Sequence, residues 1–198
     1  MKCFDAQSFE VFDVEGLDAR MVEIRAKIQP IFSDIMSEVS ARLTAYTGEE
    51  SFVHIAQHRR RLRYAPENTW SAISDNKRGY KSQAHLQLGI WQDYVFMYLS
   101  IIDNPKPKQI YARYLADHHL FPKDFVYSVD HTKPDYFSVD KGIDAAIDRL
   151  YNIKKGEFEI GRVIPRQSKI WQEDPIQYIL ETFETLFPIY QKLNQLTD

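Results

Sequence analysis

Two histidines and a run of arginines crowd one short segment of this sequence. Residues 54–64, HIAQHRRRLRY, contain His54 and His58 four positions apart, followed by Arg59, Arg60, Arg61 and Arg63. Imidazoles bind metals or exchange protons near neutral pH, and guanidinium groups bind phosphate and carboxylate through paired hydrogen bonds. The segment therefore fits half of a metal site, an anion clamp, or the solvated end of a strand.

The local secondary structure decides whether one metal ion can bind both histidines. On a helix, residues four apart lie on one face about 6 Å apart along the axis, whereas on a strand they stand about 13 Å apart. Val53 and Ile55 alternate with polar neighbours, which predicts a strand. A shared metal is then disfavoured, and His85 is the better partner. Metal-dependent hydrolysis by His54, His58 and His85 remains an alternative.

Alternation along two strands predicts a face that carries polar chemistry. The first strand directs His54 and His58 to one side, while the segment 84–91 places Leu86, Leu88 and Ile90 on one face and His85, Gln87 and Gly89 on the other. If the polar sides coincide, His54 and His85 meet there, and Tyr94 and Tyr98 enclose the same region. The alternative is a polar sheet surface facing solvent.

Cations gather next to this predicted face. The turn 75–81, DNKRGYK, offers backbone amides and cations to an oxyanion, with Tyr80 able to stack on a ring. The predicted anion-binding residues are Arg60, Arg61, Lys77, Arg78 and Lys81. Two alternatives stay open: a solvated basic loop, and a surface for RNA or an acidic protein in which cations alternate with aromatic side chains.

A third histidine follows a short predicted strand. His131 lies in VDHT, residues 129–132, where a carboxylate could orient it as an acid or base. The alternative is a polar turn closed by Pro134. The candidate catalytic residues are thus His54, His85 and His131.

The composition and the charge pattern limit the class of protein. The 198 residues are 44% hydrophobic, and Cys3 is the single cysteine, which indicates one soluble domain over residues 1–198 in a reducing cytoplasm. The longest apolar run, Tyr94 to Ile102, is too short to span a bilayer. Residues 51–81 carry seven Lys and Arg against two Asp and Glu within a chain of net charge −3, which favours a local anion site over a broad nucleic-acid surface.

Hydrophobic periodicity predicts the elements that position these side chains. Apolar spacing from Leu17 to Leu43 indicates two helices or one helix kinked at Pro30, with Gly48 as the stop. Strands are expected at 69–74, 84–91, 94–102, 124–129 and 157–164, and Gln92-Asp93 fits a hairpin turn. Three further helices are expected. One ends near His118 and His119, one runs from about Asp140 to Gly156, and one begins at Asp174. Strands in the middle and helices at both ends predict an α+β fold with an antiparallel or mixed sheet.

Four segments resemble a known family: EGLDARM, TGEESFVHIAQHRRR, NKRGYKSQAHLQLGIWQDYVFMYLS and VDHTKPD. Their order and spacing are similar to those of the YktB-like family of uncharacterised bacterial proteins across most of the chain. The resemblance implies a compact α+β domain from a bacterial cytoplasm. It supplies no activity, cofactor or catalytic residue.

The residues favour binding, with or without turnover, of a small molecule that carries phosphate or carboxylate. The alternatives are a noncatalytic module for RNA or an acidic protein, and the metal-dependent hydrolase. No GxGxxG or GxxxxGK[ST] motif is present, which weakens the argument for dinucleotide or ATP binding, and the cofactor stays unknown. We expect no membrane association, and the oligomeric state is open.

Overall fold

The computed structural model describes residues 1–116 and 120–196. Within them one seven-stranded sheet has the order β1-β2-β3-β4-β7-β5-β6, and every neighbouring pair is antiparallel. The strands are β1 (Phe52–Ile55), β2 (Asn68–Ser74), β3 (His85–Trp91), β4 (Tyr94–Ile101), β5 (Val126–Ser128), β6 (Phe137–Ser138) and β7 (Phe158–Pro165). The α+β class with an antiparallel sheet is confirmed.

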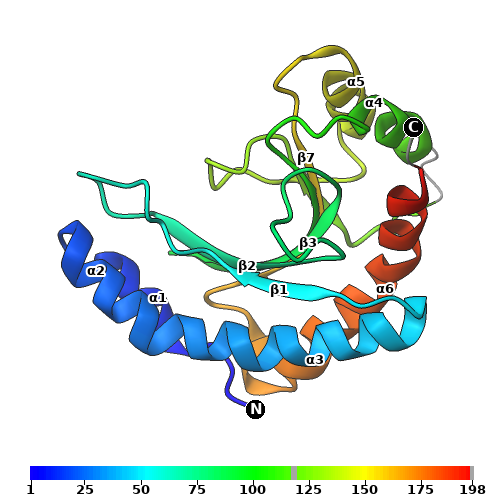
Figure 1. The fold of residues 1–198 in the computed structure, drawn as a ribbon. Coiled ribbons are helices and arrows are strands. Elements are labelled where there is room, and N and C mark those ends of the chain that lie inside the picture. The colour runs from blue at the N-terminus through cyan, green and yellow to red at the C-terminus, as the bar shows by residue number, and fades with distance from the viewer. Residues whose placement is uncertain (117–119, 197–198) are drawn as a thin grey trace.

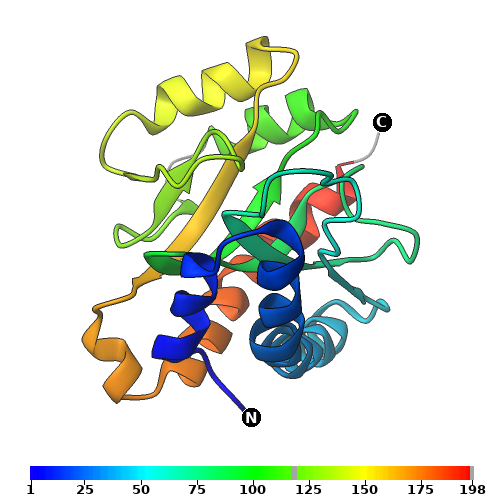
Figure 2. The same ribbon diagram turned by 90° about the vertical axis from the view of Figure 1, so that its left-hand side faces the viewer.

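Helices cover one face and one end of this sheet. They are α1 (Ala6–Glu10), α2 (Leu17–Glu23), α3 (Gln29–Thr47), α4 (Lys108–Leu115), α5 (Ile143–Asn152) and α6 (Pro175–Gln195). The long helices α3 and α6 cross beneath the strands, α3 against β1 and β2 and α6 against β3, β4 and β7 (Figure 1). The pair α4 and α5 packs at the far end from α1 and α2 (Figure 2).

The N-terminal helix is continuous through the predicted kink. A π-helical turn, Ile24–Ile28, joins α2 to α3, and Pro30 occupies the first turn of α3, where a missing N–H costs no hydrogen bond. Gly48 ends α3 in the left-handed conformation with φ 77°, as predicted.

Several element boundaries differ from the prediction by a few residues. The N-cap of α5 is Gly142, two residues after Asp140, and it adopts the left-handed conformation with φ 73°. The strand that begins at Phe52 ends at Ile55, and His58 adopts a left-handed φ of 49°, so His58 does not follow strand alternation. The helix predicted before His118 and His119 ends at Leu115, and these two histidines lie outside the described residues.

The last helix starts where it was predicted, and the predicted hairpin is present. Asp174 accepts a hydrogen bond from the Gln177 amide and Pro175 opens α6. Gln92 and Asp93 connect β3 to β4. Within the described residues, no helix is both long enough and apolar enough to cross a membrane.

Candidate functional site

The register of the strands separates the sheet into two unlike faces. Leu86, Leu88 and Ile90 of β3 point into the core formed with α3 and α6, which we call the helix-covered face. Directly paired residues share a face, so the alternate positions form the opposite one, which we call the polar face. Its members include His54, Trp70, Ser74, His85, Gln87, Tyr94, Phe96, Tyr98, Ser100 and Glu159.

Loops, not helices, cover the polar face. From the loop 75–84, Tyr80 packs between His54 and His85, with ring centroids 5.6 and 4.8 Å away. From the loop 56–67, His58 packs on the edge of Trp70 at 5.6 Å. The indole N–H of Trp70 donates to the Tyr80 hydroxyl at 2.9 Å, which joins the two contacts into one aromatic network.

A third loop, residues 129–136, closes the other side. His131 lies 6.3 Å from the Trp70 ring, Tyr136 lies 5.0 Å from Tyr94, and the Tyr94 hydroxyl donates to the Pro134 carbonyl. The structure therefore gathers four histidines around Trp70 and Tyr80: His54, His58, His85 and His131. Tyr80, Tyr94 and Tyr98, predicted as aromatic lining, lie on or over the same face.

His85 is held as a neutral ring. Its Nδ1 lies 2.9 Å from the Gln83 carbonyl oxygen, and the Gln87 amide nitrogen lies 2.9 Å from its Nε2. The proton is therefore on Nδ1, and Nε2 accepts from Gln87. Complete burial lowers the pKa of His85 to about 4, so the ring is uncharged at neutral pH. With both nitrogens engaged, His85 suits a positioning role better than proton exchange.

The two histidines of residues 54–64, His54 and His58, also have protein partners. Nε2 of His54 lies 3.0 Å from the Asn76 carbonyl, and Nε2 of His58 lies 3.1 Å from the Thr69 hydroxyl. Burial, aided by the Arg61 charge, lowers the pKa of His58 to about 4. Neither ring shares a metal-sized cluster with His85 among the described residues, so the geometry gives the three-histidine hydrolase no support.

The polar face contains a buried carboxyl group that sequence reasoning missed. Glu159 of β7 is 3% exposed, and its Oε1 accepts a hydrogen bond of 2.8 Å from Ser100, its partner on β4. Burial raises the pKa of Glu159 from 4.5 to about 7. At neutral pH the carboxyl group is therefore about half protonated. Alternation in 157–164 predicted the strand, but it gave no sign that a loop would bury this position.

A hydroxyl group without a partner lies on the same face, two positions along β4 from the Ser100 that bonds Glu159. The Tyr98 side chain is 2% exposed and stacks on Phe96 with centroids 4.9 Å apart, yet its oxygen makes no hydrogen bond. Burial, together with the nearby Tyr94 and Glu159 groups, raises the pKa of Tyr98 well above its usual value. A buried hydroxyl that lacks a partner costs free energy, and such groups are often completed by a ligand or water.

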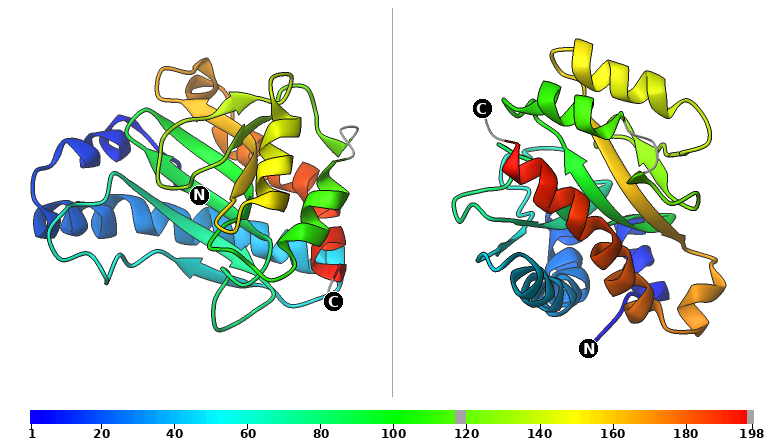
Figure 3. Two further views of the ribbon diagram at one scale, coloured as in Figure 1. Left: turned by 90° about the horizontal axis from the view of Figure 1, so that it is seen from above. Right: turned by 90° about the vertical axis from the view of Figure 1, so that its right-hand side faces the viewer.

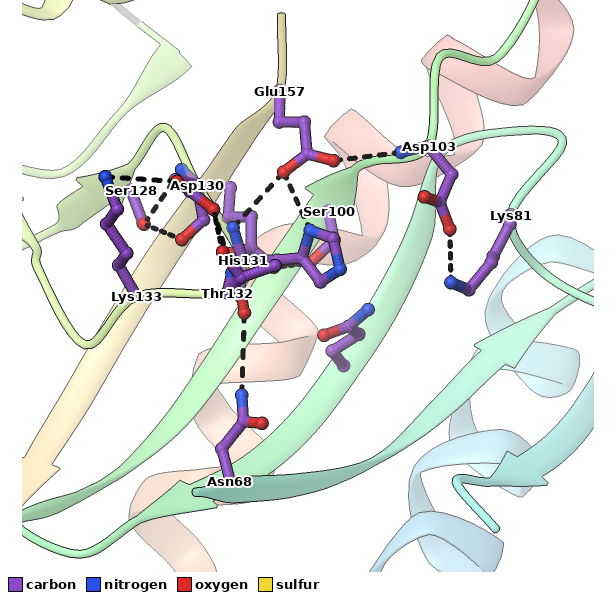
Figure 4. Close-up of polar contacts among 12 residues, drawn as sticks. Asn68, Lys81, Ser100, Asp103, Ser128, Asp130, His131, Thr132, Lys133 and Glu157 are labelled. Atoms are coloured by element: carbon purple, nitrogen blue, oxygen red, sulfur yellow. Dashed lines mark hydrogen bonds and ion pairs between the residues drawn. The ribbon is translucent and has the colours of Figure 1, made fainter. Parts of the chain in front are cut away.

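An ionic network forms the rim of the polar face (Figure 4). Nδ1 of His131 lies 2.7 Å from Glu157, whose other oxygen accepts from the Asp103 amide, and the Asp103 carboxylate pairs with Lys81. Burial alone would lower the pKa of His131, but the Glu157 carboxylate outweighs it and raises that pKa. Burial alone would raise the pKa of Glu157, but hydrogen bonds from His131 lower it.

The same network is the one place in the described chain where three potential metal ligands converge. Ligand atoms of Asp103, His131 and Glu157 lie within 4.8 Å of one another. Each already has a protein partner, and His131 and Lys81 balance the two carboxylates. The arrangement is therefore a neutralised ion-pair network. It also shows that Glu157, not the adjacent Asp130, orients His131, while Asp130 bonds Thr132 within the predicted turn.

The five predicted anion-binding cations are all exposed, on two loops. Lys81 meets the rim through Asp103, whereas Lys77 lies over the Phe52 ring at 5.9 Å and Arg61 donates to the Ala65 carbonyl. The Arg60 and Arg78 guanidinium groups extend into solvent. The cations thus surround the polar face and do not converge within it, and their role in binding an anion stays a prediction.

Comparison with known proteins identifies the family. A family model described as "Domain of unknown function (DUF1054)" matches residues 4–190. The chain is 52% identical to a UPF0637 protein of Enterococcus faecalis over 198 residues, covering 96% of this chain and 98% of that protein. It is 49% identical to the UPF0637 protein YsbB of Lactococcus lactis, covering 98% and 100%, and 41% identical to a UPF0637 protein of Exiguobacterium sibiricum, covering 96% and 98%. The resemblance to an uncharacterised bacterial family is confirmed, and the chain belongs to the DUF1054 family.

Proposed function

We propose that the protein binds a small molecule on the polar face and that Glu159 exchanges a proton with it. The observation that carries this proposal is that one face of the sheet, beneath loops, contains both a buried carboxyl group, Glu159, and the unpartnered Tyr98 hydroxyl. The Tyr98 hydroxyl can both donate and accept a hydrogen bond, and a carboxyl group that is half protonated near pH 7 can both give and take a proton. The two groups together suit general acid–base chemistry. Loops can open to admit a ligand without disrupting the helical core.

The charges around the polar face indicate how the ligand is oriented in the site. The ionised form of Glu159 makes the interior unsuited to a naked anion, and the cations of the adjacent rim are already paired, His131 with Glu157 and Lys81 with Asp103. The phosphate or carboxylate group of the ligand is therefore expected at the outer edge, where Lys77, Arg78 and Lys81 of the loop 75–84 are exposed. The remainder of the ligand, rich in hydrogen-bond donors, reaches Glu159. We place this binding in the bacterial cytoplasm, because the single cysteine fits a reducing compartment.

A titration of the isotope-labelled protein tests this proposal. Inorganic phosphate and a panel of phosphorylated and carboxylate small molecules are added while the backbone amide spectrum is recorded. We expect one ligand to shift the amides of the loop 75–84 together with those of Ser100 and Glu159 at a single saturation constant. Arg78→Ala should weaken this ligand about tenfold, a loss of about 1.4 kcal/mol, and Lys123→Ala, which removes an equally exposed cation elsewhere, should not. Shifts confined to scattered surface cations would refute the proposal.

A second function is favoured by the tip of the loop 56–67. This loop protrudes beyond the strands β1 and β2 (Figures 1 and 3). At its tip Leu62 is 93% exposed and Tyr64 is 71% exposed, with the Arg63 guanidinium 5.3 Å from the Tyr64 ring centre. Exposed apolar groups among arginines suit contact with RNA or an acidic protein. Replacing Leu62 and Tyr64 by Ser should abolish such contact, and salt-independent binding of an RNA oligonucleotide would argue against it.

A further inference from the structure

A small cavity lies away from the polar face, where the ends of two helices meet. Its volume is about 70 Å³, and it lies between the end of α3, the start of β1 and the last turns of α6. Three carboxylates line it, from Glu49, Glu50 and Asp75, together with the Tyr190 ring and the amides of Gln191 and Asn194. No Lys or Arg is among its described lining residues. The cavity is thus strongly acidic.

Both helices end beside this cavity. The helix α3 ends at Thr47 and α6 ends at Gln195, and both residues line the cavity. The end of α3 lies beside α6, whose last turns continue past it (Figure 1). The last carbonyl groups of a helix together act as about half a negative charge, which favours a cation within the last turn. Two helix ends and three carboxylates therefore reinforce one another.

A buried hydroxyl in the cavity wall lacks a hydrogen-bond partner. The Tyr190 side chain is 4% exposed, and its oxygen makes no hydrogen bond of acceptable geometry, although it lies beside the Asp75 backbone. Burial, followed by the charge of Asp75, raises the pKa of Tyr190, and Glu49 contributes in the same direction. The charges of two carboxylates that line the cavity thus act on this hydroxyl. It is available as an acceptor for a donor placed there.

The other polar groups of the wall also offer acceptors. The Asn194 amide nitrogen is used, because it donates to the Ala84 carbonyl at 3.2 Å, which leaves its Oδ1 free to accept. The Thr47 hydroxyl donates to the Leu43 carbonyl at 3.0 Å. In the described chain the three carboxylates do not form a cluster of metal-ligand geometry. The cavity thus presents dispersed acceptors, which suits a cation with several N–H donors better than a bare divalent ion.

We propose that this cavity binds a primary ammonium group at the end of a short aliphatic chain. An ammonium group has three donors, which match the Tyr190 oxygen, the Asn194 amide oxygen and the Asp75 carboxylate. The volume equals about two waters at about 30 Å³ each, enough for an aminomethyl terminus but not for a ring. The site uses none of the residues that carry the proposed function, which are Glu159, Tyr98, Ser100, Lys77, Arg78 and Lys81, so its failure would leave that function intact.

Calorimetric titration with 1,4-diaminobutane at low ionic strength tests this assignment, with 1,4-butanediol as the uncharged probe of the same length. We expect the diamine to bind at one site and the diol not to bind. Tyr190→Phe removes only the unpartnered oxygen, so the variant should fold with an unchanged or higher melting temperature and bind the diamine about fivefold more weakly, a loss of about 1 kcal/mol. Asp75→Asn should weaken binding about tenfold, or about 1.4 kcal/mol.

Asp148→Asn is the matched control, because it removes one exposed carboxylate on α5 and should leave the affinity unchanged. Amide shifts limited to residues 47–51, 75 and 190–195 would locate the diamine in the cavity. The assignment is overturned if the diamine does not bind, if all three variants bind it equally, or if Mg²⁺ at the same concentration displaces it.

Discussion

The two faces of the sheet are formed by the same strands but bury different kinds of side chain. On the helix-covered face, Leu86, Leu88 and Ile90 are fully buried against α3 and α6, and the contacts are apolar. On the polar face, the adjacent residues His85, Gln87 and Ser100 are equally buried, but beneath loops. Burial on the first face stabilises the fold. Burial on the second costs desolvation of polar groups, a cost that the proposed ligand site would explain.

The largest expected difference between the two faces is in the stability lost when a buried side chain is shortened. Phe183→Ala removes a fully buried ring of α6 and should lower the free energy of unfolding by about 4 kcal/mol, through lost burial and a residual cavity. Urea denaturation measures this change. Tyr98→Phe on the polar face should alter stability by less than about 0.5 kcal/mol, because no hydrogen bond is lost. Equal losses in both variants would remove the distinction between the faces.

Glu159→Gln should stabilise the protein above pH 7. The unfolded chain releases this proton near pH 4.5, whereas the native state keeps it until about pH 7. The native state therefore binds more protons between these values, so stability falls as pH rises through this window and is constant above it. Replacing Glu159 by glutamine removes this loss of stability. The loss amounts to about 3 kcal/mol, because each pKa unit of difference between the two states corresponds to about 1.4 kcal/mol.

Denaturation curves of Glu159→Gln at pH 5 and pH 9 measure the effect, with the exposed Glu173→Gln as control. No gain at pH 9 relative to the control would show that Glu159 is ionised at little cost.

His85 should have the opposite pH dependence. Its pKa is about 4 in the native state and 6.5 when unfolded, so below pH 6.5 the unfolded state binds the extra proton. Stability is then lost as pH falls toward 4, by up to about 1.4 kcal/mol per pH unit for one proton. His85→Gln should flatten the stability profile in this window, as measured by urea titrations from pH 4 to 7. An unchanged slope would mean that the ring is protonated in the native state.

Gly89→Ala should have a smaller effect, confined to the polar face. An added Cβ atom would lie 2.0 Å from the Phe96 ring, which must move to accept it. We expect a loss of about 1 to 2 kcal/mol from overpacking and, because Phe96 stacks on Tyr98, a shift of the Tyr98 ring resonances. Unchanged aromatic resonances would show that Phe96 does not support Tyr98.

Local patterns in the sequence predicted most of the elements and half of the site. Alternation around Gln92-Asp93 gave the hairpin of β3 and β4, and the Asp174 cap gave α6. The same alternation correctly placed His54 and His85 on one face with Tyr98. Strand β6 and helix α1 were missed, because two and five residues carry too little periodicity.

The acidic half of the site depends on long-range pairing that no local pattern contains. Glu159 meets Ser100 because β7 pairs with β4 across 59 positions. Glu157 meets His131 because the loop 129–136 folds back over the strands. In the sequence, both glutamates look like ordinary outward positions of a half-exposed strand. Tertiary packing alone turned one of them into a buried carboxyl group.

The most direct test of the account is a carbon-detected NMR titration of the Glu159 carboxyl group between pH 3 and 9, assigned by comparison with Glu159→Gln. The account predicts a midpoint near pH 7. A midpoint near 4.5 would contradict it, because the polar face would then hold an ordinary ionised carboxylate with no proton to exchange.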